Sequence, residues 1–175
     1  ISLPAGAGYD PAARPGLASF ASAMLDEGAG PMDSAAFQNA LASKAIQLSA
    51  HVDRDYLTIS VTSLRENVPD ALHLLQLALS HPRFDAEAVA RVRAQIIQSL
   101  QQSEAEPPSV AAKGFAKAFF NGHVYGHPGA GEIGAIAATR PEELRAFARS
   151  HWVKGGLMVA VAGDIAPAQL VKLLQ

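Results

Sequence analysis

The first pattern along the chain is a helical one. Between residues 16 and 28, apolar side chains recur at the three- and four-residue spacing that places them on one face of a helix. These residues are Leu17, Phe20, Ala21, Met24 and Leu25. A stretch of glycine and proline at 28–31 ends the segment. We therefore expect a helix within residues 16–28 with one face against the core.

Five later helices are predicted by capping residues followed by apolar stripes. Their starts are expected at Asp33 or Ser34, Asn67, Asp85, Ser109 and a capping box over Thr139–Glu142. The inner faces expected for them, in the same order, are Phe37, Ala40 and Leu41; Leu72, Leu75 and Leu79; Val89, Val92, Ile96 and Leu100; Val110, Phe115 and Phe119; and Leu144 and Phe147.

A period of two marks the strands. Residues 46–51 and 56–63 alternate between apolar and polar side chains, and the polar stretch 53–55 joins them, so we expect an antiparallel hairpin. The run 157–162 is apolar at every position, which predicts a strand that is buried on both faces. Together these elements predict an α+β fold, in which an antiparallel or mixed sheet has helices packed on one face.

Length and composition predict one globular domain over residues 1–175. Apolar residues make up 49% of the chain and charged residues 17%, which disfavours disorder. A net charge of −2 gives no electrostatic reason to expect nucleic acid or a membrane as a partner. Because there is no cysteine, disulfides and thiolate metal sites are excluded. Both ends interrupt a strand or helix pattern, so we expect the domain to be a fragment of a longer two-domain subunit.

Five segments, in this order and spacing, resemble the pitrilysin/insulinase family of zinc metallopeptidases, the inverzincins. They are the turn at 5–11, the hairpin at 45–56, His81-Pro82-Arg83-Phe84 before the long helix, the segment 123–131, and the Gly-Asp turn that ends 159–164. The family carries the motif H-x-x-E-H on the helix that follows the first of these segments, where two His bind zinc and the Glu activates water.

The resemblance places residues without the required chemistry at every zinc position. Ser19 and Ala23 stand at the two His positions, and Ser22 stands at the Glu position. The third ligand, a Glu of the long helix, falls in the region of Gln98 and Ser99. A hydroxyl is a poor zinc ligand and a weak base, and alanine has no donor atom. The resemblance therefore implies no catalytic residue, no metal and no cofactor in this domain, with zinc expected in an active partner.

Histidines elsewhere offer two weaker metal candidates. His123 and His127 are four residues apart, but the glycines and prolines around them predict a loop, where that spacing has no meaning for a metal site. His51 lies near Asp53 and Asp55 at the end of the hairpin, where charged groups are usually solvated. We expect structural or solvent-facing roles for all three histidines.

Other motifs also favour structural roles. The glycine-rich segment 126–134 lacks the lysine of a phosphate loop. Ser19 and Ser22 lack the G-x-S-x-G context of a serine nucleophile. Asp26 and Glu27 are expected to form a solvated acidic turn after the first helix.

Three functions stay open at this stage. The resemblance implies a non-catalytic domain that pairs with an active zinc peptidase subunit, or with a second half of its own chain, around a bound peptide. The second is a purely structural subunit that binds no peptide. The third is a polypeptide whose active zinc site lies in the other half. Relatives in bacteria imply a periplasmic location, with the cytoplasm as the alternative.

Overall fold

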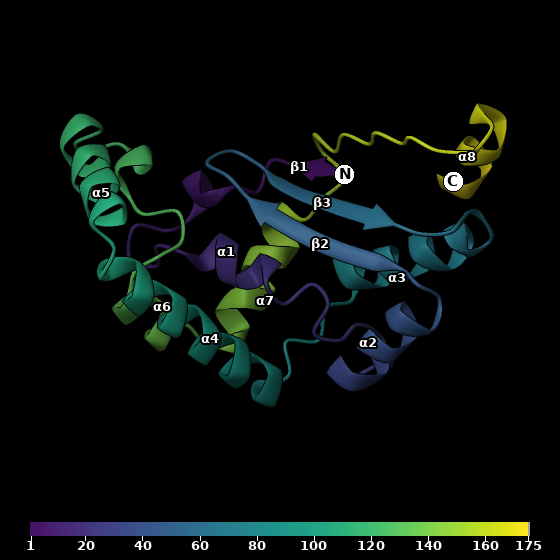
Figure 1. Cartoon of the computed structure of the whole chain (residues 1–175), viewed down its shortest axis with the longest axis horizontal. Coiled ribbons are helices and arrows are strands. Elements are labelled where there is room, and N and C mark those ends of the chain that lie inside the picture. The colour runs from purple at the N-terminus through teal and green to yellow at the C-terminus, as the bar shows by residue number, and fades with distance from the viewer. Residues whose placement is uncertain (175) are drawn as a thin grey trace.

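A three-stranded antiparallel sheet forms one layer of the protein. The structure is a computed structural model that describes residues 1–174, and the side chains of all of these except residues 167 and 174 (Figure 1). The strands β1 (Ser2–Leu3), β2 (Gln47–Val52) and β3 (Leu57–Thr62) lie in the order β1-β3-β2. The hairpin is confirmed, with Gln47 opposite Thr62 and Val52 opposite Leu57. Asp53 closes its turn by accepting hydrogen bonds from the backbone N–H groups of Asp55 and Tyr56, at 2.8 and 2.7 Å.

Helices form the second layer, and α1, α2, α3, α4 and α7 lie on the same side of the sheet (Figure 1). The α+β prediction is therefore confirmed. The helices are α1 (Leu17–Ser22), α2 (Ser34–Ser43), α3 (Val68–Ser80), α4 (Ala86–Glu104), α5 (Pro107–Phe119), α6 (Ile133–Ala138), α7 (Pro141–His151) and α8 (Pro167–Leu174). Short 3₁₀ helices occur at η1 (Ala7–Tyr9), η2 (Arg65–Asn67) and η3 (Val124–Gly126).

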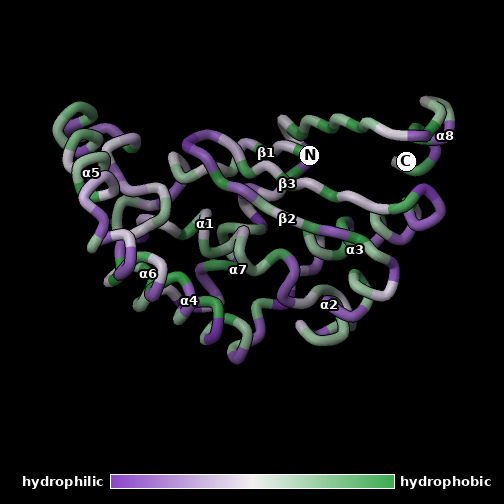
Figure 2. The backbone as a smooth tube through the Cα atoms, in the orientation of Figure 1, coloured by the Kyte–Doolittle hydropathy of each residue, from purple (hydrophilic) through white to green (hydrophobic). Residues whose placement is uncertain are grey.

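Two apolar clusters form the core. One joins α1, α4, α6 and α7 around Phe20, Phe84 and Leu144, and the other joins the sheet to α2 and α3 around Phe37 and Ile59. Figure 2 shows hydrophobic stretches along the helices and strands, and also along the run that leads to α8. All five apolar residues predicted for the first helix are buried, although α1 ends at Ser22 and turns replace the rest of the expected helix.

Some expected caps and faces are wrong. The buried face of α3 is formed by Ala71, Leu74, Leu75 and Ala78, while Leu72 and Leu79 are only half-buried. Asn67 makes no side-chain cap, because its amide donates to the backbone carbonyl of Lys44 at 2.8 Å. These differences have a common cause. Contacts with residues far away in the chain use the polar group that would cap the helix, and they also determine which face of the helix is buried.

The two helices near the glycine-rich segment also begin at unexpected positions. α5 starts at Pro107, before the expected cap, and the hydroxyl of Ser109 donates to the Glu106 carboxylate. α7 starts after Arg140, whose backbone N–H donates to the Glu143 carboxylate at 2.8 Å, so the capping box lies one residue later than predicted. The helix α6 between them was not predicted. The expected inner face of α5 is wrong, since Val110, Phe115 and Phe119 are all exposed.

The expectation of a buried strand at 157–162 is also wrong. Only Met158 pairs, in an isolated bridge to Ser2, and every residue of the run is exposed. The run continues beside the sheet toward α8 (Figure 1). Its sequence is that of an interior strand, but its neighbours do not cover it.

Candidate functional site

The start of α1 is held by a carboxylate and by a close contact between two glycines. Asp10 accepts hydrogen bonds from the backbone N–H groups of Gly16 and Ala18, both at 2.7 Å. Burial raises the pKa of Asp10 to about 6, although these N–H groups act to lower it. Gly16 and Gly131 both have left-handed backbones, with φ of 94° and 97°. A Cβ at Gly16 would lie 2.5 Å from the Cα of Gly131, so α1 begins directly against the glycine-rich segment.

The three residues that the resemblance aligns with H-x-x-E-H lie within this helix or directly after it. The hydroxyl of Ser19 donates to the carbonyl oxygen of Gly129 at 2.8 Å. Ser22, only 8% exposed, donates to the carbonyl oxygen of Ser19 at 2.9 Å. Ala23 follows the last residue of the helix and is exposed. Both hydroxyls thus donate to backbone carbonyl groups, which holds α1 and the glycine-rich segment in place. Neither is hydrogen-bonded to a side chain that could act as a base.

These residues do not fit a zinc ion. Structural and catalytic zinc sites use three or four imidazole, thiolate or carboxylate ligands, and this helix presents two hydroxyls and a methyl group. Within residues 1–174, no group of three or more His, Cys, Asp or Glu residues lies close enough together to hold a metal ion. We therefore assign no chemical step to a metal in this domain.

Helix α4 contains the two residues at which the family resemblance predicts the third ligand position. Gln98 and Ser99 are both exposed. Since seven residues are close to two full turns of a helix, Gln98 lies nearly in line with Arg91 along α4, whereas Ser99 is displaced from that line by about a quarter of a turn. The side of α4 that packs against α1 is formed instead by the buried residues Val89, Val92 and Leu100.

Glu27 is a buried, ion-paired side chain whose position the sequence did not indicate. The expectation of a solvated acidic turn is wrong for it, because the residue is only 8% exposed. Its carboxylate accepts hydrogen bonds from the Arg91 guanidinium and, at 2.6 Å, from the Ser34 hydroxyl. Burial opposes ionisation, but the bonds from Arg91 and Ser34 hold the pKa of Glu27 below its usual value. The Glu27–Arg91 ion pair, together with the bond from Ser34, therefore joins the segment after α1 to α2 and α4.

Replacing Glu27 by glutamine is expected to destabilise the protein by about 1–3 kcal/mol, because charged hydrogen bonds to Arg91 are lost. A carboxyl with a lowered pKa contributes stability above the pKa of the unfolded chain, and this contribution disappears as the pH falls through the folded value. Urea unfolding at neutral and acidic pH should therefore show a difference between the two proteins that shrinks on acidification. The exposed Glu66→Gln is the control, and a difference independent of pH would contradict this account.

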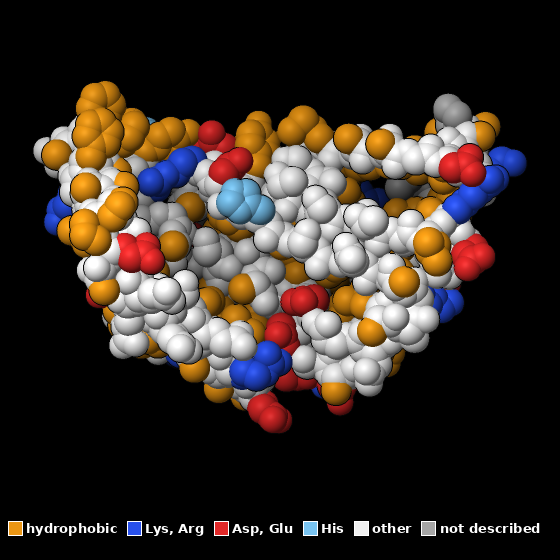
Figure 3. Space-filling model, in the orientation of Figure 1, with side chains coloured by type: hydrophobic (Ala, Val, Ile, Leu, Met, Phe, Trp, Pro, Cys, Tyr) orange, Lys and Arg blue, Asp and Glu red, His pale blue; other side chains and the backbone are white. Residues whose placement is uncertain are grey.

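The outer edge of β2 lies beside α1. β2 is the outermost of the three strands, and it is largely exposed (Figure 3). Alternation in an antiparallel ladder directs the backbone groups of Gln47, Ser49 and His51 toward β3. The N–H and C=O groups of Leu48 and Ala50 therefore point to the open edge. Within the described residues, no other strand pairs with this edge.

The turn of the hairpin is bound to the start of the glycine-rich segment. The Tyr125 hydroxyl donates to the Asp55 carboxylate at 2.6 Å, and the Arg54 guanidinium donates to the carbonyl oxygen of His127. The bond to Asp55 raises the pKa of Tyr125. The segment and α5 line a hollow of about 870 Å³. These contacts hold the hairpin that contains β2, the helix α1 and the glycine-rich segment together.

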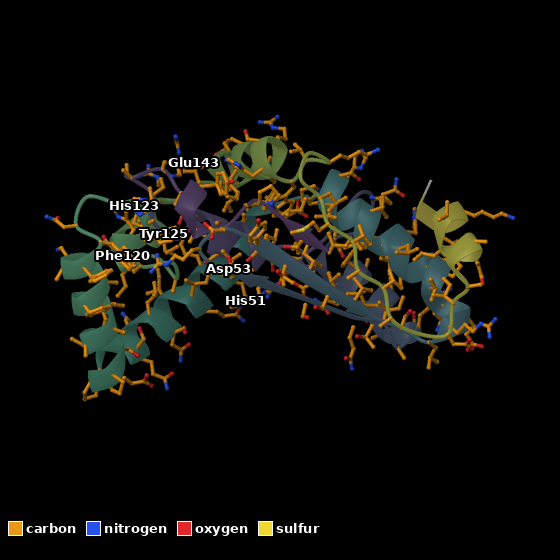
Figure 4. The ribbon with its side chains drawn as sticks, turned by 90° about the horizontal axis from the view of Figure 1, so that it is seen from above. His51, Asp53, Phe120, His123, Tyr125 and Glu143 are labelled. Carbon is orange, nitrogen blue, oxygen red and sulfur yellow. The ribbon has the colours of Figure 1, made fainter. Side chains whose placement is uncertain are left out.

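The predicted histidines lie on the same side of the protein but serve no common site. Figure 4 shows His123 with Phe120 and Tyr125 at η3, and His51 further along the hairpin. The Nδ1 atom of His123 accepts a hydrogen bond from the backbone N–H of Tyr125 at 3.2 Å. His51 and His127 are exposed. The structure gives each histidine a local or solvent-facing position.

The architecture is that of one domain of a zinc peptidase of the pitrilysin type, without a metal-binding cluster in its described part. The profile of the family described as Insulinase (Peptidase family M16) matches residues 1–131, and the chain belongs to this family. A Helicobacter pylori protein described as "Non-peptidase homolog YmxG" is 24% identical over 159 residues, which are 91% of this chain and 37% of the relative.

Two solved structures extend the comparison. A peptidase M16 inactive domain from Pseudomonas fluorescens has a TM-score of 0.78 and 25% identity, over 84% of this chain and 36% of that one. The periplasmic protease PqqL from Escherichia coli has a TM-score of 0.83 and 15% identity, over 99% of this chain and 20% of that one. The chain thus spans less than half the length of the relatives that it matches, and those relatives include an inactive domain and a non-peptidase homologue.

Proposed function

We propose that this is the non-catalytic domain of a zinc protease of family M16, which binds peptide and pairs with an active zinc-bearing subunit or second half. The observation that carries the proposal is the open edge of β2 beside a helix without zinc ligands. The outward backbone groups of Leu48 and Ala50 offer an extended peptide the hydrogen bonds of an added strand. Strand addition needs only backbone groups, so the loss of zinc ligands leaves it intact.

Pairing is supported by the lengths of the relatives. The match covers 42% of a protease from Helicobacter pylori and 38% of the first half of PqqL. A peptide on the edge of β2 would have one side against this domain and its other side open to a second domain. The periplasmic neighbour supports a periplasmic location, and no helix within the described residues is long and apolar enough to cross a bilayer.

The edge of β2 can be tested with a matched pair of variants. Ala50→Pro removes the N–H that points outward, while leaving the bonds between β2 and β3 unchanged, and proline is tolerated on such an edge. Ala50→Thr keeps that N–H and is the control. Fluorescence anisotropy of a labelled unstructured peptide on the full-length protein should show at least about tenfold weaker binding for Ala50→Pro only, which is about 1.4 kcal/mol.

The same titration separates the other functions. No peptide binding by the unaltered protein, alone or with its partner, would favour the purely structural subunit. Cleavage of the peptide by the full-length protein that a chelator abolishes would place an active zinc site in the other half. Equal loss of binding in both Ala50 variants would contradict strand addition at β2.

A further inference from the structure

The hollow of about 870 Å³ lies between α5 and the glycine-rich segment, next to the turn of the hairpin. In Figure 1, α5 lies beyond the turn end of β2 and β3, at the opposite end of the molecule from α8. Pockets that bind small ligands have volumes of about 300–1,000 Å³. The space is therefore large enough to receive several side chains of a bound peptide.

Contacts between α5 and η3 hold the walls of the hollow in place. A Cβ at Gly126 would lie 2.9 Å from the carbonyl oxygen of Phe120, so η3 packs directly on the end of α5. The rings of Phe120 and Tyr125 meet edge to face, with their centroids 5.7 Å apart, and Tyr125 is bonded to Asp55 of the hairpin turn. Figure 4 shows Phe120, Tyr125 and His123 together beside α5. The hairpin turn and α5 are thus connected through η3.

Three cationic side chains line the hollow. Lys113 and Lys117 come from α5, and Arg54 comes from the turn of the hairpin. The two lysines are four residues apart and therefore share one face of the helix. Phe115 and Phe119, which are exposed, do not line the hollow. The helix thus presents its lysines, and not its aromatic stripe, to this space.

The charges of these cations are only partly compensated by the protein. Lys113 lies 4.0 Å from the carboxylate of Glu104, whose side chain is 56% exposed. Within residues 1–174, neither Lys117 nor Arg54 forms an ion pair with a carboxylate. Arg54 donates to the carbonyl oxygen of His127, which carries no net charge. Two of the three cations are therefore free to pair with an anionic ligand.

The sign of the charge in the hollow is opposite to that of the whole chain. Glu104 and Glu132 are the carboxylates among the lining residues, against three Lys or Arg side chains, so the formal charge of the lining is positive. The whole chain has a net charge of −2. A local field of this sign favours acidic groups in the hollow and disfavours basic ones.

We infer that the hollow binds acidic side chains of the peptide that adds to the edge of β2, a placement that rests on the strand addition proposed above. Arg54 follows Val52, the last residue of β2, by two residues. A peptide that pairs with Leu48 and Ala50 and continues past Val52 therefore reaches the hollow. Partly exposed ion pairs are individually weak. The three cations accordingly select acidic sequences, while the backbone bonds at β2 supply binding that does not depend on sequence.

Fluorescence anisotropy on the full-length protein at neutral pH compares two labelled peptides. Both contain a central stretch of serine, threonine and valine, which is flanked on each side by glutamates in one peptide and by glutamines in the other. The glutamate peptide is expected to bind at least about fivefold more tightly, because several weak ion pairs act together. Lys113→Gln combined with Lys117→Gln should reduce this preference to less than about twofold without weakening the binding of the glutamine peptide.

Lys154→Gln combined with Lys172→Gln is the matched control. Both lysines are exposed and lie outside the hollow, and the same charge is removed. This variant should keep the full preference, and an equal loss in it would reduce the effect to net charge and overturn the inference.

The remaining outcomes separate this inference from strand addition. If both peptides bind the unaltered protein equally and Ala50→Pro weakens both, the acidic preference is wrong and strand addition stands. If neither peptide binds, both are wrong. Tighter binding of a third peptide, flanked by lysines, would also overturn the inference, because it would show that Glu104 and Glu132 dominate the hollow.

Discussion

Replacing Phe84 by alanine is expected to destabilise the protein by about 3–5 kcal/mol, the loss typical of a large aromatic side chain at the centre of a core. Phe84 is 1% exposed and is a central member of the cluster between α1, α4 and α7. Its ring lies 6.2 Å from that of Trp152, centroid to centroid. Arg145 holds the backbone around it by donating to the carbonyl oxygens of Arg83 and Phe84, at 2.9 and 3.0 Å.

A second variant at this position separates packing from backbone strain. Phe84 has φ of 50°, a left-handed conformation that is unfavourable for a bulky residue and that glycine adopts readily. Glycine is normally less stable than alanine by up to about 1 kcal/mol, but at this position Phe84→Gly should be at least as stable as Phe84→Ala. Denaturant unfolding measures both. Phe119→Ala, on a residue that is 68% exposed, is the control and should change stability by less than about 0.5 kcal/mol.

The second large effect is the return of zinc binding. The triple variant Ser19→His, Ser22→Glu, Ala23→His should place two imidazoles one turn apart, because Ala23 keeps a helical backbone with φ of −67° and ψ of −10°. Two ligands are expected to bind zinc only weakly. Adding Ser99→Glu should tighten the binding by at least about tenfold, which is about 1.4 kcal/mol.

Gln98→Glu in the same triple variant is the comparison, because it moves the carboxylate one residue along α4 and therefore to a different side of the helix. Isothermal calorimetry with zinc alone compares the two. A gain at Gln98 and none at Ser99 would move the alignment of the long helix by one residue. If neither variant binds zinc more tightly than the triple variant, the long helix supplies no ligand to a site on α1. Metal binding should return before activity, since the hydrogen bonds that orient zinc ligands are also missing.

The sequence determined the elements that local chemistry controls. The hairpin follows from alternation over 46–51 and 56–63, and the α+β class follows from adding the helical stripes. The five apolar residues around α1 are buried as the spacing predicts. The resemblance to the M16 family came from short segments whose order is encoded directly in the chain, and the match over residues 1–131 confirms it. The meaning of Ser19, Ser22, Ala23, Gln98 and Ser99 as former zinc positions stays a prediction.

Tertiary structure decided which groups are satisfied and which surfaces are covered. Glu27 is acidic and follows a helix, so its sequence context indicates solvent, yet Arg91, 64 residues away, makes its burial favourable. The aromatic residues of α5 and the apolar run 157–162 have the composition of buried elements and are exposed. A hydrophobic pattern indicates that burying a surface would be favourable. Burial also requires a second surface to pack against, and the position of that surface depends on contacts between residues far apart in the chain.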